Sequence, residues 1–331
     1  MFSVTNDRGF VPQSEQFEGR DMVGEDIKAY KIIHTNDFAY NPARINVGSI
    51  AMYTGERPCM ISSLYVCFKT TKEVNNEWLM QLLKTPKMNY YYNVNGEGGV
   101  RVYLFYPNFA RIRMSIPKIE EQKKIAKLLN LIDERIATQN KIIDKLQSLI
   151  KGIRNDVFGK LRKSIGFNTM ISDVLCYEQP QPYIVENTEY TAEGIPVLTA
   201  NKAFVLGYTS ETNGIYDKGD CIIFDDFTLD CKYVDFPYKI KSSAIKILTA
   251  KNKELLRYTF EFLKYLDLST EGHKRHYIAE TQNQGIILPT EQMVKTIAHI
   301  FSTLSLRMET AVKQRNVFEK QKQYLLRQMF I

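Results

Sequence analysis

PKIEEQKKIAKLLNLIDERIATQNKIIDKLQSLIKGIRNDVF, residues 117–158, decides the fold of this chain, because a similar segment follows without a gap at residues 289–330. Identical residues recur 172 positions later at the start, the middle and the end of the segment: Pro117 as Pro289, Arg135 as Arg307, and Phe158 as Phe330. Self-similarity at a long fixed period marks a duplicated structural unit. The chain is therefore expected to run globular, helix, globular, helix.

Both copies have the apolar spacing of long amphipathic helices. In the first copy, apolar residues recur every seven positions at Leu129, Ile136, Ile143, Ile150 and Val157. A second set beside this row, Leu128, Ile142 and Leu149, widens the apolar stripe. Such heptad rows are typical of coiled-coil helices. Pro117 and Pro289 each stand just before a Glu-Gln pair, as in a first helical turn. Two equivalent helices in a duplicated chain are expected to pair antiparallel, with pseudo-two-fold symmetry.

The remaining sequence predicts two small α+β domains. Strand-like runs bounded by Gly and Pro precede a helical stretch in both copies: 29–33, 49–53, 63–68 and then 77–83 in the first, and 195–200, 221–224, 243–248 and then 253–266 in the second. The expected fold class is α+β, with two globular domains joined by two long antiparallel coiled-coil helices. The expected boundaries are 1–115, 116–163, 164–287 and 288–331.

Composition limits the class of protein further. With 331 residues, 44% of them hydrophobic, the chain can bury two ordinary cores. No run approaches the roughly 20 apolar residues of a membrane span, and the first residues lack the pattern of a signal peptide. The five cysteines form no C-x-x-C pair, so neither a disulfide framework nor a thiolate zinc site is indicated. We expect a cytoplasmic protein without a membrane partner.

The net charge of +7 is unevenly distributed. Basic residues exceed acidic ones in both repeated segments, whereas acidic residues exceed basic ones across residues 164–288. A basic balance favours a polyanionic partner such as nucleic acid. Any contact between the second globular domain and DNA must therefore come from a local basic patch.

Three strings resemble one protein family: YKIIHTNDFAYNPARINVGSIAMY at 30–53, GIPVLTANKAFVLGY at 194–208, and IPKIEEQKKIAKLLNLIDERI at 116–136. Together they make the chain similar, over essentially its whole length, to the specificity subunit of bacterial type I restriction-modification systems. The resemblance implies two target recognition domains, each reading one half of a split sequence in double-stranded DNA. It also implies that the two helices set the spacing of the half-sites and dock two methyltransferase subunits.

The resemblance further implies a non-catalytic subunit that works with methyltransferase and restriction subunits. S-adenosylmethionine, Mg²⁺ and ATP would belong to those partners, and this chain would hold no cofactor. One departure from the family pattern concerns the first domain. Fewer residues precede Asn36-Asp37 than separate Ser164 from the equivalent Gly219-Asp220. We therefore expect the first recognition domain to lack an opening strand and helix.

Candidate site residues lie in loops, since no catalytic or metal motif is present. The sequence has no Pro-Pro pair, hence no methyltransferase tetrad, and no phosphate-binding loop or H-E-x-x-H. Arg, Asn and Lys match base edges and phosphates. The candidates in the first domain are Tyr40, Asn41, Arg44, Asn46, Gly98, Gly99 and Arg101. Those in the second are Asn201, Lys202, Lys232, Lys274, Arg275 and His276.

Other interpretations stay open at this point. Each candidate residue could instead shape a turn or belong to a solvated charged face. The whole chain could be a coiled-coil adaptor that binds only protein, or a nuclease or methyltransferase in its own right. Activity of the isolated chain would identify an enzyme, and a salt-dependent gel shift would separate a DNA reader from an adaptor.

Overall fold

The computed structural model describes residues 1–16, 29–99, 102–200, 203–268 and 276–330. Contacts between Cα atoms divide the chain into two units. Unit 1 comprises residues 1–139 and 313–331, and unit 2 comprises residues 140–312. Each long helix contributes one part to each unit, so the units are described separately.

Unit 1 contains two small sheets and short helices. One sheet has the strand order β2-β1-β6-β3, and the other has the order β5-β4-β7. The strands are β1 (Phe2–Thr5), β2 (Gly9–Pro12), β3 (Lys31–Ile33), β4 (Phe38–Tyr40), β5 (Ile50–Met52), β6 (Cys59–Ile61) and β7 (Val66–Phe68). The helices are α1 (Gln13–Gln16), α2 (Asn76–Leu83), α3 (Pro86–Asn95) and α4 (Tyr106–Phe109), with a 3-10 turn, η2, at Ile45–Val47. The predicted strands at 29–33, 49–53 and 63–68 and the helix at 77–83 are confirmed.

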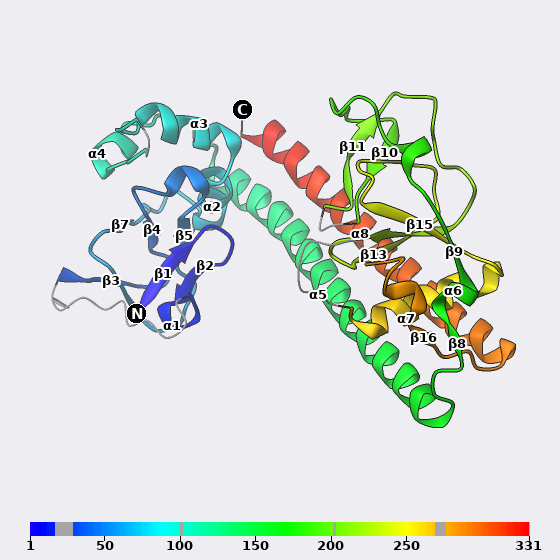
Figure 1. Ribbon diagram of the computed structural model, residues 1–331. Helices are drawn as coiled ribbons and strands as arrows, with labels where there is room; N and C mark the ends of the chain where they lie inside the picture. The colour runs from blue at the N-terminus through cyan, green and yellow to red at the C-terminus, as the bar shows by residue number, and fades with distance from the viewer. Residues whose placement is uncertain (17–28, 100–101, 201–202, 269–275, 331) are drawn as a thin grey trace. The chain divides into compact units, whose positions relative to one another are not determined.

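Unit 2 has a larger mixed architecture (Figure 1). Its sheets have the orders β13-β12-β15-β9, β11-β10-β14 and β16-β8. The strands are β8 (Thr169–Met170), β9 (Leu175–Glu178), β10 (Ile195–Leu198), β11 (Val205–Thr209), β12 (Cys221–Asp225), β13 (Cys231–Val234), β14 (Lys239–Ile240), β15 (Ile245–Ala250) and β16 (Gly285–Ile286). The helices are α6 (Ile171–Val174) and α7 (Lys253–Leu266), with 3-10 turns η3 (Gln181–Tyr183) and η4 (Thr281–Asn283). The strands predicted near 195, 221 and 243 and the helix at 253–266 are confirmed.

The two repeated segments form the long helices α5 (Ile119–Ser164) and α8 (Glu291–Met329). Both begin two residues after the repeated proline, so the helix starts keep the register of the duplication. In unit 1, Asp133 of α5 accepts from Lys322 of α8 at 2.6 Å, and Arg135 lies 5.8 Å from the ring centroid of Phe318. Residue numbers rise along α5 as they fall along α8, so the pair is antiparallel. In unit 2, Arg154 of α5 lies 5.9 Å from the ring centroid of Phe301.

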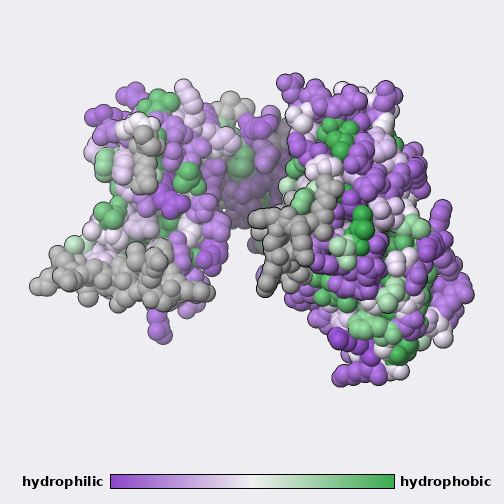
Figure 2. Space-filling model, in the orientation of Figure 1, coloured by the Kyte–Doolittle hydropathy of each residue, from purple (hydrophilic) through white to green (hydrophobic). Residues whose placement is uncertain are grey.

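The predicted apolar stripe of α5 is buried only in part. Leu129, Ile143 and Ile150 of the seven-residue row are at most 8% exposed. The flanking set, which was expected to widen the stripe, is not buried: Leu128, Ile142 and Leu149 are 39–48% exposed. Only a narrow seam of α5 is covered at these positions, as in a two-stranded coiled coil. Figure 2 shows such apolar side chains scattered over a largely hydrophilic surface in both units.

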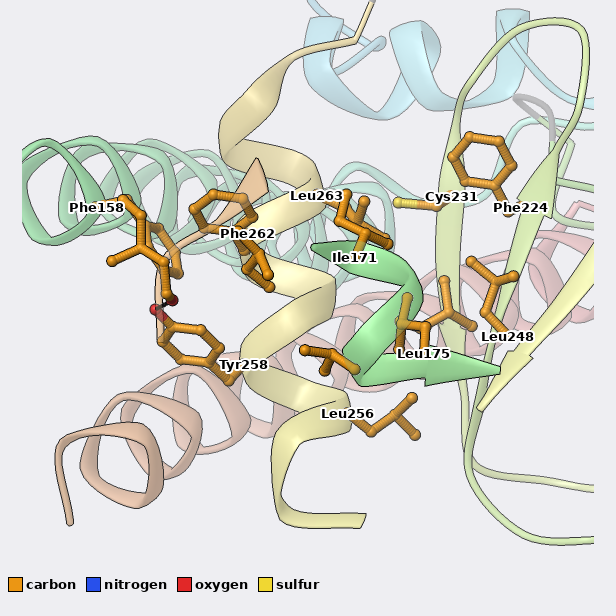
Figure 3. Packing of buried hydrophobic residues seen from close by; sticks show 14 of the residues in the cluster. Phe158, Ile171, Leu175, Phe224, Cys231, Leu248, Leu256, Tyr258, Phe262 and Leu263 are labelled. Atoms are coloured by element: carbon orange, nitrogen blue, oxygen red, sulfur yellow. Dashed lines mark hydrogen bonds between the residues drawn. The ribbon is translucent and has the colours of Figure 1, made fainter. Parts of the chain in front are cut away.

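Each helix ends by inserting a phenylalanine into a domain core. Phe158, near the end of α5, is fully buried in unit 2, with Tyr258 and Phe262 of α7 at centroid distances of 5.4 and 5.3 Å (Figure 3). Its repeat equivalent Phe330 is 7% exposed in unit 1 and lies 5.7 Å from Trp78 of α2. The duplication thus extends from sequence to packing, as pseudo-two-fold symmetry predicts.

Candidate nucleic-acid interface

The predicted site in unit 1 begins where β4 ends. The Asn41 carboxamide oxygen accepts the N–H of Ala43 at 3.0 Å, and its backbone carbonyl accepts the N–H of Arg44 at 3.0 Å. An Asx turn of this kind reverses the chain directly after a strand. The turn leads into η2 and ends at Gly48, whose φ of +96° favours glycine. Arg44, at the start of η2, is consequently presented to solvent.

Arg44 and Asn41 border a hollow of about 310 Å³ together with residues from the β1–β2 turn, among them Asn6 and Arg8. Gly48 allows this approach, because a Cβ at its position would lie 3.3 Å from the Cβ of Asn6. Among the described residues, Arg8 forms a long, exposed ion pair, 3.9 Å from Glu15. Arg44 has no ion-pair partner within the described parts of the chain. The hollow therefore presents guanidinium and carboxamide groups beside the carboxylate of Asp7, and the guanidinium and carboxamide groups can pair with phosphates or with guanine and adenine edges.

Sequence reasoning missed Asn6 and Arg8. They lie more than thirty residues before Arg44, in a segment without a motif, and only strand pairing brings them to the hollow. The pattern FSVTNDRGFVP, two short apolar runs around Asn-Asp-Arg-Gly, is a recognisable hairpin signal and could have identified the turn.

The glycine-rich loop lies next to the same turn. Glu97 and Tyr103 exchange two backbone hydrogen bonds of 2.8 Å, which close the loop that contains Gly98 and Gly99. The N–H of Leu104 then donates to the carbonyl of Pro42 at 3.0 Å. The structure thus brings together two regions that the sequence predicted separately. Gly98 has a φ of +104°, and a side chain at Gly99 would meet only open space. Arg101 lies outside the described residues.

Two further candidates of this turn have structural contacts. The Asn46 carboxamide donates to Asn93 at the end of α3, at 3.1 Å, which ties η2 to that helix. Tyr40 is fully buried and packs against Phe68 and Phe109 at centroid distances of 6.5 and 5.1 Å. Burial raises the pKa of the Tyr40 phenol far above its ordinary value. We assign Tyr40 to packing beneath the turn, because a fully buried side chain cannot touch DNA in this conformation.

In unit 2 the described candidates lie around the β12–β13 turn. The backbone N–H groups of His276 and Tyr277 donate to the Asp226 carboxylate at 3.1 and 2.7 Å. His276 is 2% exposed, and its Nδ1 lies 2.8 Å from Glu280. Asp226 is in turn 3.6 Å from the buried ammonium of Lys246. His276 is therefore held at the sheet by backbone contacts, and its ring does not face solvent.

Lys232 of β13 lies on the same turn, 3.2 Å from Asp230. Burial alone would raise the pKa of Asp230, but the ammonium groups of Lys264 and Lys232 lower it below the ordinary value. The charge of Lys232 is thus partly compensated, unlike that of Arg44. Asn201, Lys202, Lys274 and Arg275 lie outside the described residues.

The parts of the chain that the structure describes contain no group of three His, Cys, Asp or Glu side chains that could hold a metal ion. Asp225 and Asp226, adjacent acids at the end of β12, have other partners: the Asp225 carboxylate accepts the N–H groups of Phe227 and Thr228 at 3.0 and 2.8 Å. None of the helices in the described ranges is long and apolar enough to cross a membrane.

Comparison with protein families gives these loops a context. Residues 25–148 match the family described as type I restriction modification DNA specificity domain. This segment includes the Asn41–Asn46 turn, the glycine-rich loop and the first half of α5. This part of the chain is therefore similar to DNA specificity domains.

Individual relatives agree with that class. The chain is 44% identical over 126 residues to the type I restriction enzyme EcoR124I/EcoR124II specificity subunit of Escherichia coli, a match that spans 36% of this chain and 31% of that subunit. It is 24% identical over 343 residues to the protein named type I restriction enzyme MjaX specificity subunit of Methanocaldococcus jannaschii, covering 92% of this chain and 80% of the relative.

A solved structure extends the similarity to the fold. The S subunit of the type I restriction-modification system from M. genitalium superimposes with a TM-score of 0.67 at 15% identity, over 90% of this chain and 84% of that one. The likeness at 15% identity shows a shared fold, while the sequence similarity to type I specificity proteins is carried by residues 25–148 and by the relatives above.

Proposed function

We propose that this chain is the non-catalytic subunit that gives a type I restriction-modification complex its DNA sequence specificity. The observation that carries the proposal is the match of residues 25–148 to a DNA specificity domain, whose turn presents the exposed Arg44, without an ion-pair partner among the described residues. A guanidinium offers paired donors that match O6 and N7 of guanine in the major groove. In this proposal the hollow between Arg8 and Arg44 faces one half of the target.

A bipartite target follows from the duplicated architecture. Each mismatched base pair costs roughly 1–3 kcal/mol, so one small domain that reads a few base pairs cannot select a single genomic site. Two domains that read separate half-sites multiply their selectivity. We propose residues 1–115 and 164–287 as the recognition domains, and residues 116–163 and 288–331 as the helices that connect them.

Two methyltransferase subunits, and restriction subunits beyond them, are the proposed protein partners. Exposed apolar side chains on the long helices support docking, because a bound partner would remove them from water. They are Leu128, Leu131, Ile142 and Leu149 on α5, and Leu306, Val317 and Tyr324 on α8. Methyl transfer and nucleotide hydrolysis, with their cofactors, would belong to these partners, and the complex would work in the cytoplasm.

Mapping of methylated bases in cells that carry the partner subunits tests the proposal. The unmodified chain should produce methylation at one split sequence, and a strain without the chain should lack it. Arg44→Ala should relax or abolish the requirement at one half-site only, with the other half-site unchanged. Arg111→Ala is the matched control, since Arg111 is also exposed in unit 1 but lies outside the hollow.

Two outcomes would overturn parts of this proposal. If Arg44→Ala weakened binding to all sequences equally, Arg44 would be a phosphate contact and not a base reader. If cells with the partner subunits gave the same methylation pattern with and without the chain, the adaptor interpretation would replace DNA reading.

A further inference from the structure

Two aromatic side chains stand half-exposed on one short segment of unit 1. Tyr103 and Phe105 are 38% and 47% exposed, whereas Leu104 between them is fully buried. Side chains alternate between faces along an extended chain, so the two rings share the outer face while Leu104 packs into the core that contains Tyr40. The rings lie nearly parallel, with an interplanar angle of 16° and centroids 6.2 Å apart. We call Tyr103 and Phe105 the aromatic platform.

Backbone hydrogen bonds hold the aromatic platform on both sides. Tyr103 exchanges two hydrogen bonds of 2.8 Å with Glu97. The carbonyl of Phe105 accepts the N–H groups of Asn108 and Phe109 of α4, at 3.1 and 3.0 Å. The Asn108 carboxamide also donates to the Glu97 carboxylate at 2.7 Å, which ties that acid to α4. Because the backbone that carries the rings is already held, binding of a ligand to them costs little further conformational entropy.

The aromatic platform is attached to the Asn41–Asn46 turn. The N–H of Leu104, its middle residue, donates to the carbonyl of Pro42 at 3.0 Å. Pro42 lies between Asn41 and Arg44, which border the hollow described above. Two residues span at most about 7 Å, which is less than the roughly 12 Å width of the major groove. DNA that lies against Arg44 therefore also passes the aromatic platform.

Flat apolar rings beside DNA are suited to its bases and not to its phosphates. Every base has a π face that can stack on an aromatic ring, whatever the sequence. In an intact duplex these faces are covered by the neighbouring base pairs, so only a base that has lost a neighbour can stack on protein. Methyltransferases create such bases, because they extrude their target base from the duplex. DNA that undergoes methylation therefore offers the ligand that the aromatic platform fits.

We propose that the aromatic platform stacks on a DNA base that has lost its neighbour in the half-site at unit 1. This inference rests on the proposed function and adds a second role to the same face. Arg44 contacts the edge of a base, whereas Phe105, the more exposed of the two rings, presents its face, with Tyr103 packed behind it. The aromatic platform stabilises opened DNA and does not select the sequence, because stacking is tolerant of base identity.

Binding of single-stranded DNA to the full chain tests the stacking itself, because the bases of a single strand have no paired neighbours to lose. The probe is a fluorescein-labelled oligothymidine, whose fluorescence anisotropy reports binding. Phe105→Leu keeps an apolar side chain but removes the ring, and it should weaken binding at least about fivefold, the lower limit for loss of one stacked base. Phe105→Tyr keeps the ring and should bind like the unmodified chain.

A control variant and photocrosslinking locate the contact. Tyr90→Leu is the matched control and should not change binding, since Tyr90 is 64% exposed on α3 and its ring contacts Tyr91. Iododeoxyuridine in the same oligonucleotide crosslinks to aromatic rings that stack on it, so the crosslinked peptide should contain Tyr103 or Phe105. Thermal melting checks that the variants are folded. Equal binding by Phe105→Leu and Phe105→Tyr, or crosslinks confined to other segments, overturns the proposal.

Methylation mapping with the partner subunits separates this inference from the proposed function. Phe105→Leu should slow methylation and leave the recognised sequence unchanged, unlike Arg44→Ala. If the chain had no effect on the methylation pattern, the proposed function would fail, yet ring-dependent binding of oligothymidine would still support a stacking site. If Phe105→Leu abolished methylation without weakening DNA binding, the aromatic platform would be a contact with a partner protein, and the stacking proposal would be overturned.

Discussion

Phe158 and Phe330 occupy equivalent positions, yet their substitution by Ala should cost different amounts. Phe158 is fully buried, with the rings of Tyr258, Phe262 and Tyr265 within 5.4 Å of its own. Loss of a buried Phe side chain costs about 3–5 kcal/mol, and aromatic pairs contribute beyond burial. Phe158→Ala should therefore lower the free energy of unfolding of unit 2 by about 4–5 kcal/mol.

Phe330→Ala should cost less, about 3 kcal/mol, at the low end of the same range. Phe330 is 7% exposed, its one described aromatic neighbour is Trp78, and it borders a hollow that already exists. The loss should fall on unit 1, because its neighbours belong to that unit.

Guanidinium denaturation followed by two signals separates the effects. Trp78 emission reports unit 1, and far-UV circular dichroism reports both units. Phe330→Ala should move the Trp78 midpoint, whereas Phe158→Ala should move only the circular dichroism transition. Val317→Ala, at a 61% exposed position of α8, is the control and should move neither. A loss below about 1 kcal/mol for Phe158→Ala would contradict the packing argument, as would equal shifts of the Trp78 midpoint in both Phe variants.

Three further perturbations have defined outcomes. Glu261 is 1% exposed and bridges Arg154 at 2.6 Å and Arg257 at 3.0 Å. In denaturation experiments, Glu261→Ala should therefore destabilise unit 2 by about 3–5 kcal/mol, and Glu261→Gln should destabilise it by less. Burial raises the pKa of the Cys221 and Cys231 thiols to about 12. The contribution of these thiols to stability should therefore be complete below about pH 9 and decline as pH rises toward 12. At pH 8 a disulfide reagent should label exposed Cys176 first, and Cys176→Ser should remove that fast phase of labelling. Matched seven-residue insertions after Gln139 and Ala311 should lengthen the unspecified gap between half-sites by about three base pairs, because seven helical residues add about 10 Å. An unchanged gap in methylation mapping would refute a spacing role for the helices.

Sequence alone determined the elements whose signals are local and repeated. The starts of α5 and α8 follow from Pro117 and Pro289, and the heptad row gave the buried seam through Leu129 and Ile143. Strand runs such as CIIF became β12 because β-branched and aromatic residues bounded by turn residues favour strands wherever they lie. The Asn41–Asn46 turn was also readable, since Asn, Pro and Gly specify turn geometry by their own side chains and backbone freedom.

Only the tertiary structure decided which of these residues meet. Burial of Tyr40 depends on Phe68 and Phe109, and the hollow at Arg44 depends on Arg8. Neither contact produces a repeating pattern of residues that could be recognised in the sequence. Exposure of Leu128 and Ile142 likewise depends on how many helices pack against α5. That no described strand pairs with the outer edge of β7 likewise becomes visible only in the folded unit. Each of these features is a pairing between distant segments, and such pairings are fixed by which surfaces remain to be covered once the local elements have formed.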